Sequence, residues 1–217
     1  MPKLKTSKEL MKFLGGLKGQ LKKNAKDIIL VDGGNIFSVD LFAISVIHRS
    51  LLLIAGFCLL IKKSNFLSAA PIIRLYLDTL LQFYALSIVK DPNEFAMKKL
   101  NGKQTNNLKD RDGNKMTDGY LLSQIAKEKE FEWVENVYKE TSKFIHFIDK
   151  HILSACTKIK ANGVVTFCLS DKIDTPKSAE REAIITMIAI TNGLLTYLFC
   201  NGWVFTKNNP YSIKKNK

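Results

Sequence analysis

The sequence predicts an all-α protein, a helical bundle of long antiparallel helices with one small β-hairpin near residues 158–170. The chain has 217 residues, which suits a single domain of ordinary size. Its five prolines and twelve glycines are few, and this favours long helices over a sandwich of many short strands. Hydrophobic residues make up 46% and charged residues 24%, so the chain has enough apolar side chains to bury a sizeable core.

The first element is expected to be one or two short amphipathic helices within residues 3–26. Leucines recur there at roughly helical spacing between lysines. Gly15, Gly16 and Gly19 weaken the pattern, because glycine is a poor helix former. A turn is expected at 32–35, where the sequence reads Asp-Gly-Gly-Asn.

Breaks and capping residues separate the longer helices. Ser64 and Asn65 end one helix and begin the next. Pro92 occupies a favoured position in the first turn of another, and Thr117 or Asp118 caps a later one. The expected helices cover residues 38–62, 66–89, 92–100, 117–127, 131–150 and 179–199, with a polar loop at 101–116.

The stretch after residue 157 changes character. Apolar residues alternate on both sides of Asn162-Gly163, and such a pair is the strongest short-range hairpin signal. We therefore expect the hairpin there. The chain as a whole divides into a basic N-terminal helical segment (1–37), a helical domain (38–205) and a basic tail (206–217).

The charge balance is strongly basic. Lysine and arginine number 33 against 20 aspartates and glutamates, a formal net charge of +13. Such an excess attracts polyanions, namely nucleic acid, nucleotides or an anionic membrane face. Most of it is lysine, which attracts diffusely rather than reading bases through paired hydrogen bonds. The alternative is a lysine-rich surface that serves only solubility.

Cysteine usage and apolar runs bear on the compartment. Four cysteines, none in a CxxC pair, indicate a reducing compartment, so we expect a cytoplasmic protein. Lysines interrupt the leucines near the N-terminus, so no export signal is expected. Of two long apolar stretches, 41–61 carries His48 and Arg49 near its centre, and 183–205 carries threonines and asparagines. Both are expected to be core helices, and a membrane partner is not expected; association through 183–205 is the further alternative.

No familiar metal or cofactor motif is present. The sequence has no Walker A loop, no GxGxxG and no HExxH. Residues 110–121 resemble a calcium loop at three positions, but Lys115 stands where glycine is needed and Leu121 where glutamate is needed. We therefore expect neither a metal nor a cofactor.

Two sets of polar side chains interrupt the apolar helices at 38–62 and 66–89. Arg74, Asp78 and Gln82 are spaced four apart, so they share one helix face. An Arg74–Asp78 ion pair would order the core or hold the geometry of a site. Arg49, beside His48, must find an anion or water, and either a carboxylate such as Asp78 or a ligand phosphate would satisfy it.

A third set lies in the helix expected at 131–150. Tyr138, Ser142 and His146 are also four apart, with Lys139 and Lys143 on the adjoining face. Histidine, with an ordinary pKa of about 6.5, suits acid–base chemistry on a phosphodiester when lysines lie beside it. The alternative is a histidine that is hydrogen-bonded in the core.

Residues 38–205 resemble the HEPN superfamily (higher eukaryotes and prokaryotes nucleotide-binding). The resemblance rests on the runs HRSLLLIAGFCLLIKKSNFLSAAPIIRLYLDTLLQFYAL, TDGYLLSQIA and YKETSKFIHF. They contain the patterns A-x-x-x-x-R-x-x-x-[ED] and Y-x-x-x-S-x-x-x-H. The matching positions are Ala69 or Ala70, Arg74, Asp78, Tyr138, Ser142 and His146.

The resemblance implies a helical bundle that is often a homodimer. Many members are metal-independent ribonucleases of toxin–antitoxin or anti-phage defence systems, so it also implies RNA as a substrate and an antitoxin or defence protein as a partner. In such an enzyme His146 would help the ribose 2′-hydroxyl attack the phosphate, while an arginine stabilises the developing charge.

This chain departs from the ribonuclease motif at the arginine. Lys139 and Glu140 stand where that arginine would lie, so Arg74 or Lys139 would supply the charge. The alternative is a non-catalytic module that binds a nucleotide, a nucleic acid or a protein. In either case the phosphate-holding and positioning residues would be Lys143, Arg49, Asp78, Tyr138 and Ser142.

Overall fold

The computed structural model is predominantly helical, which confirms the all-α bundle expected from the sequence. It describes residues 6–30, 34–144, 156–159, 163–167, 170 and 175–199. The helices are α1 (Ser7–Leu30), α2 (Ser38–Lys62), α3 (Phe66–Ile88), α4 (Pro92–Leu100), α5 (Asp118–Ile125), α6 (Val134–Ser142) and α8 (Lys177–Phe199), with 3-10 helices at Thr105–Asn107 and Lys129–Phe131.

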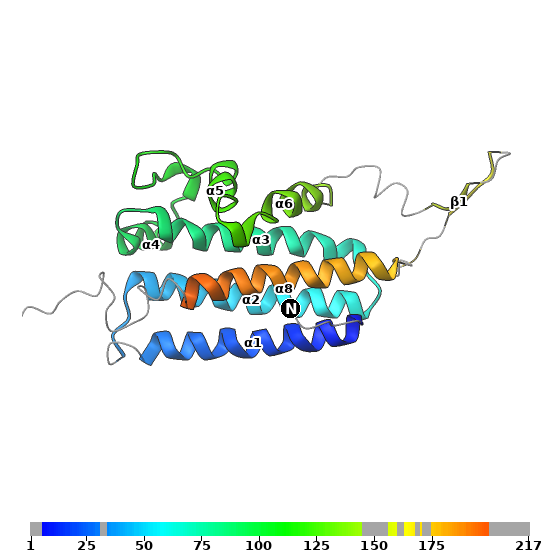
Figure 1. Cartoon of the computed structure of the whole chain (residues 1–217), viewed down its shortest axis with the longest axis horizontal. Helices are drawn as coiled ribbons and strands as arrows, with labels where there is room; N and C mark the ends of the chain where they lie inside the picture. Colours follow the sequence, from blue (N-terminus) through cyan, green and yellow to red (C-terminus); the bar gives the residue numbers. More distant parts are fainter. Residues whose placement is uncertain are drawn as a thin grey trace, which may run out of the picture.

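Four long helices form the bundle. α1 and α3 each pack against both α2 and α8, so α2 and α8 lie at diagonally opposite corners. Figure 1 shows that α1, α3 and α8 run in one direction and that α2 runs against them. α4 packs mainly against α2, whereas α5 and α6 pack along α3 on the side away from α1 (Figure 1).

Local capping residues set the ends of the middle helices as the sequence predicts. The side chain of Asn65 accepts a hydrogen bond from the backbone of Ser68, and Asp91 accepts two from the first turn of α4. Thr117 caps α5 in the same way through the N–H of Tyr120. Each cap satisfies backbone donors that have no partner within the helix, so these boundaries follow from a few neighbouring residues.

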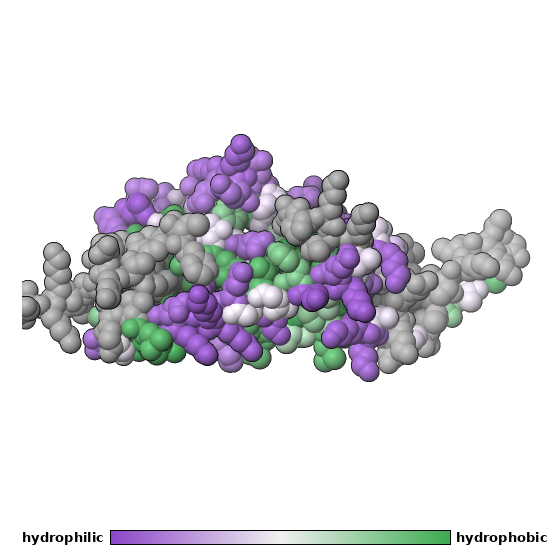
Figure 2. Space-filling model, turned by 60° about the horizontal axis from the view of Figure 1, so that its bottom comes forward, coloured by the Kyte–Doolittle hydropathy of each residue, from purple (hydrophilic) through white to green (hydrophobic). Residues whose placement is uncertain are grey.

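α1 is one continuous helix and is longer than the sequence predicts. Leu14 and Leu21 are completely buried, within a stripe whose members alternate at steps of four and three. The glycines lie on the exposed side of the helix, and Figure 2 shows hydrophilic residues over much of the face to which α1 contributes. Each glycine costs roughly 1 kcal/mol, whereas each buried leucine contributes about 1.5–3 kcal/mol, so packing outweighs the local penalty.

Gly16→Ala is expected to raise the free energy of unfolding by about 0.5–1 kcal/mol. A Cβ at this position would meet nothing within 4 Å, and its φ is not in the left-handed region. The alanine therefore removes conformational freedom from the unfolded chain without a clash. Urea denaturation followed by circular dichroism would measure the gain, and a loss of stability would contradict the exposed position of the glycine.

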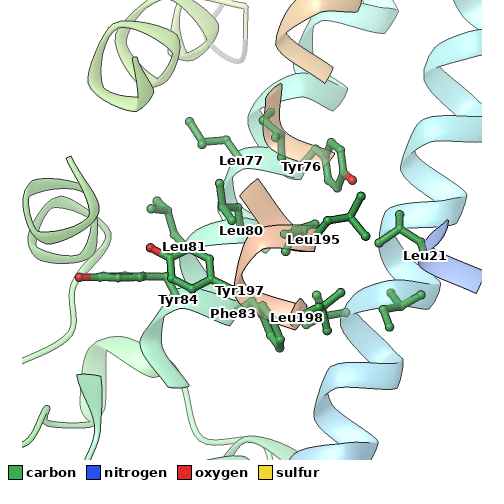
Figure 3. Close-up of a cluster of buried hydrophobic side chains, with 14 of the residues drawn as sticks. Leu21, Tyr76, Leu77, Leu80, Leu81, Phe83, Tyr84, Leu195, Tyr197 and Leu198 are labelled. Atoms are coloured by element: carbon green, nitrogen blue, oxygen red, sulfur yellow. The ribbon is translucent and has the colours of Figure 1, made fainter. Parts of the chain in front are cut away.

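A cluster of buried hydrophobic side chains lies between α3 and α8, with Leu21 of α1 alongside (Figure 3). Tyr76 of α3 is fully buried there, and its hydroxyl donates to Oγ1 of Thr191 on α8 at 3.0 Å. Thr191 donates in turn to the carbonyl of Met187 at 2.7 Å. Burial raises the pKa of Tyr76, so the hydroxyl stays neutral and joins the two helices without an unsatisfied polar atom.

α8 approaches the turn before α6 very closely at Gly193. A Cβ there would lie 2.7 Å from Cε1 of Phe131 and 3.3 Å from Cδ2 of Leu80. The ring of Phe131 stacks on that of Tyr197, with 5.2 Å between centroids. Glycine at this position therefore lets the aromatic layer lie directly on the helix backbone.

The expected hairpin is present, formed by β1 (Cys156–Ile159) and β2 (Val165–Phe167), which pair antiparallel. Gly163, with φ of +80°, lies between the strands in the left-handed region that glycine adopts easily. The helix expected at 131–150 begins later, as α6 at Val134. Its second half, with His146, lies outside the described residues.

Candidate functional site

Arg74, in the middle of α3, is the centre of the polar cluster that the sequence predicts. Its side chain is 7% exposed and forms an ion pair with Asp78 one turn later, as expected from the spacing. The carboxylate of Asp118, in the first turn of α5, lies 4.0 Å from Nη2. The guanidinium carbon lies 3.8 Å from the centroid of the Tyr138 ring on α6. Three helices therefore meet around one buried cation.

Arg74 is stabilised by an ion pair and by contact with an aromatic ring. Burying a guanidinium is costly unless it is paired, and Asp78 supplies that pair. The face of Tyr138 adds a cation–π contact, which contributes about 1–2 kcal/mol when it is partly desolvated. Nε of Arg74 is buried and has no hydrogen-bond partner among the described residues. The cluster thus holds α5 and α6 on α3 and engages the charge of Arg74 within the protein.

A pocket of about 730 Å³ opens beside this cluster, between α2, α3, α4 and the start of α5. Asp78 and Asp118 belong to both the cluster and the pocket wall. The pocket combines two cations, amide and hydroxyl side chains, and an apolar portion. Its lining residues are Phe42, Ser45, Val46, Arg49, Asp78, Thr79, Gln82, Lys99, Gln104, Thr105, Asn106, Thr117, Asp118 and Gly119.

The two cations of the pocket, Arg49 and Lys99, are held by hydroxyl groups. Nε of Arg49 donates to Oγ1 of Thr79 at 3.0 Å. Nζ of Lys99 donates to Oγ1 of Thr105 at 2.9 Å, and Thr105 donates to the amide oxygen of Gln82. Within the part of the chain that the structure describes, neither cation forms an ion pair with a carboxylate.

The pocket wall carries two cations, Arg49 and Lys99, and two carboxylates, Asp78 and Asp118. Both carboxylates lie beside the further cation Arg74. The carboxylate of Asp78 is engaged by Arg74, so the charges of Arg49 and Lys99 are not cancelled by it. Burial lowers the pKa of Lys99, because desolvation disfavours its charged form. A partly desolvated cation that shares a pocket with an arginine and several hydrogen-bonding groups is suited to hold a phosphate or another anion.

The structure brings together some of the residues that the sequence proposes and leaves others apart. Arg74, Asp78 and Tyr138 are in contact, and Arg49 lies in the pocket that Asp78 also lines. Arg49 does not pair with Asp78, contrary to one of the two expected arrangements, because Asp78 is engaged by Arg74. Gln82 lies one turn further along the pocket wall.

The residues proposed on α6 beyond Tyr138 are engaged locally. The hydroxyl of Ser142 donates to the carbonyl of Tyr138 at 2.7 Å, a bond within the helix. Lys143 forms an ion pair with Glu140 at 2.6 Å. Lys139 is exposed. His146 lies outside the described residues, so its place relative to Arg74 stays a prediction.

Sequence reasoning did not single out Lys99, Thr105 or Asp118 as site residues. Lys99 is one of several lysines near the end of α4, and nothing in its neighbours distinguishes it. Thr105 lies in the stretch expected to be a polar loop, which folds back onto α3. Asp118 was expected only at a helix start, where it does lie; its approach to Arg74 depends on how α5 packs.

The calcium-like loop is occupied by the protein's own donors. Asp110 is buried, and its carboxylate accepts from the backbone N–H groups of Asp112 and Asn114 and from the hydroxyl of Tyr120. Although burial alone would raise the pKa of Asp110, these hydrogen bonds lower it overall. Among the described residues, no group of three or more His, Cys, Asp or Glu side chains is arranged to hold a metal ion.

No family model, no curated protein and no solved structure matches the chain.

Proposed function

We propose that this chain is a HEPN-like protein that binds RNA or a nucleotide in the pocket between α2, α3 and α4. The observation that carries the proposal is the pair of cations, Arg49 and Lys99, which line one pocket without a carboxylate partner among the described residues. The net charge of +13 supports it, because a basic protein draws polyanions toward such a site.

The pocket chemistry suits a nucleotide in particular. Arg49 and Lys99 would hold the phosphate through charge-assisted hydrogen bonds. The amides of Gln82 and Gln104 carry both donors and acceptors, which match the edges of a base. Phe42 supplies an apolar surface in the same pocket. The cluster around Arg74 would act as the support that fixes the pocket wall.

A metal-independent ribonuclease is the second candidate, and the contact between Arg74 and Tyr138 favours it. This contact joins the two helices that carry the resemblance to HEPN proteins. His146 would be the acid–base group, with Lys139 and Lys143 near the phosphate. The resemblance extends the proposal to a homodimer that acts in toxin–antitoxin or anti-phage defence.

Binding is expected to weaken about tenfold for Arg49→Gln and for Lys99→Gln, because each removes one phosphate contact. The probe is a fluorescently labelled single-stranded RNA of mixed sequence, followed by anisotropy at two salt concentrations in EDTA. Each variant should also flatten the dependence of log Kd on log salt by about one unit. Binding should decline as the pH rises toward the lowered pKa of Lys99, since deprotonation removes its charge.

Lys98→Gln is the matched control, because Lys98 directly precedes Lys99 on α4, is exposed and pairs with Glu94. It should change the affinity little. Equal losses for Lys98→Gln and Lys99→Gln would refute the pocket and leave only diffuse attraction. Gel electrophoresis of the RNA in the same samples tests for cleavage. If the protein is a ribonuclease, the native protein should cleave the RNA and His146→Ala should not.

A further inference from the structure

α2 has a second apolar face, opposite the one that packs into the bundle. The core side is lined by residues such as Ala43, Ile47 and Ile54, which are buried. On the outer side, Leu52 and Leu59 are 60% and 59% exposed. Beside the exposed Arg49, the other exposed positions alternate at steps of four and three along the helix: Leu41, Ser45, His48, Leu52, Ala55, Leu59 and Lys62.

Apolar residues of α3 lie next to this outer face of α2 and enlarge the apolar surface. Gly56 of α2 lies at the seam between the two helices, where its Cβ position is 3.6 Å from Cδ1 of Ile72. Leu75, one turn after Ile72 on its exposed side, is 41% exposed. Leu52, Leu59, Ile72 and Leu75 therefore belong to one exposed surface, the leucine patch. Exposed apolar patches of this kind mark interaction sites on soluble proteins.

Lysines flank the leucine patch. Lys62 and Lys63 lie at the end of α2, three and four residues after Leu59. Lys18 of α1 lies near the same end, since Lys18 and Lys62 both act electrostatically on the thiol of Cys58.

The acidic residues of α1 and α2 are placed away from this rim. Glu9 and Asp27 are each nine positions from Lys18, about two and a half turns, so they lie on the opposite side of α1. Within α2 the sole acidic residue is Asp40, which is buried and accepts from the backbone N–H of Phe37 at the start of the helix. The leucine patch is therefore apolar at its centre and basic along its edge.

We propose that the leucine patch docks on an anionic lipid surface. Leucines enter the boundary between headgroups and acyl chains, and lysines extend their charged ends to lipid phosphates. Unpaired RNA bases stack on aromatic or arginine side chains, which the leucine patch does not contain, and a second copy would bring another lysine rim against the first. The chemistry therefore favours a lipid surface over both.

The contact is peripheral. Among the described helices α2 alone is long and apolar enough to cross a membrane, by length and composition. Its inner face is packed against α1 and α3, and Arg49 donates to Thr79 of α3. Crossing would break these contacts, whereas docking through the outer face keeps them. This surface differs from residues 183–205, where Ala183, Ile184 and Met187 are buried in the core.

Co-sedimentation of the full chain with extruded vesicles tests the proposal. Vesicles of phosphatidylcholine alone are compared with vesicles in which roughly a third of the lipid is phosphatidylglycerol. The native protein is expected to bind the anionic vesicles at least tenfold more tightly. Leu52→Gln combined with Leu59→Gln should lower that affinity at least tenfold, and Lys62→Gln combined with Lys63→Gln should remove much of the preference for anionic lipid.

Met97→Gln on α4 is the matched control, because Met97 is 49% exposed and lies outside the leucine patch. It should leave vesicle binding unchanged, and circular dichroism should show all variants folded. Failure of the native protein to sediment with anionic vesicles would overturn the proposal, as would unchanged binding by the leucine variant. A dimer in light scattering that the leucine variant converts to a monomer, without vesicle binding, would assign the patch to a second copy instead.

Discussion

Asp78→Ala is expected to lower the free energy of unfolding by about 3 kcal/mol. The substitution leaves the guanidinium of Arg74, whose side chain is 7% exposed, without its ion-pair partner. The other carboxylate nearby, Asp118, is 4.0 Å away and 55% exposed, so water screens much of its charge. Urea denaturation followed by circular dichroism would measure the loss.

A second ion pair of the same spacing provides the control. Glu94 and Lys98 are also four residues apart on a helix, but both side chains are exposed. Glu94→Ala is therefore expected to cost less than about 0.5 kcal/mol. Equal costs for Glu94→Ala and Asp78→Ala would show that burial does not strengthen the Arg74–Asp78 pair.

Removing both charges of the buried pair distinguishes the stability that the pair contributes from the penalty of leaving one buried charge unpaired. In Arg74→Met combined with Asp78→Leu no buried charge is left unpaired, so much of the stability lost in Asp78→Ala should return. The contact with Tyr138 is then apolar and loses only its cation–π part. If the double variant were less stable than Asp78→Ala, the pair itself would be a net source of stability.

Gly193→Ala is expected to destabilise the fold by about 2 kcal/mol, because the added methyl group overfills a packed core. The new Cβ would lie 2.7 Å from the ring of Phe131, which is 2% exposed and stacked on Tyr197. The ring also packs against Trp133, so moving it aside would disturb its contacts with both neighbouring rings. Thermal and urea denaturation would both report the change.

Two further variants test whether the close approach at Gly193 causes the loss of stability. Gly16→Ala is the same substitution in an open helix position and should have the opposite sign. Combining Gly193→Ala with Phe131→Leu removes part of the ring that the methyl group meets. The double variant should therefore lose less stability than the sum of the losses in the two single variants. Strict additivity would contradict the close approach at Gly193.

The helix boundaries could be predicted because they depend on neighbours in the sequence. Asn65, Asp91 and Thr117 each bond to backbone groups two or three residues away, so the signal is local. α1 shows the limit of such reasoning. Its glycines indicate a weak helix, and only the burial of leucines against α2 and α8 explains why it is continuous.

The candidate site was predictable in part for a similar reason. Helical spacing places Arg74 and Asp78 on one face, and the structure confirms that they pair. Spacing within one helix does not specify how α2 is rotated about its axis relative to α3. This rotation places Arg49 against the hydroxyl of Thr79 rather than against a carboxylate. It also does not show that Thr105 folds back to Lys99.

The shared direction of α1, α3 and α8 gives the bundle an electrical polarity. Each helix carries a macrodipole equivalent to roughly half a positive charge at its N-terminus. Three N-termini gather at one end of the molecule, against one C-terminus, that of α2 (Figure 1). Lys62 and Lys63 lie at this same end and add to its positive potential. In the field of a polyanion the protein would rotate so that this end approaches first.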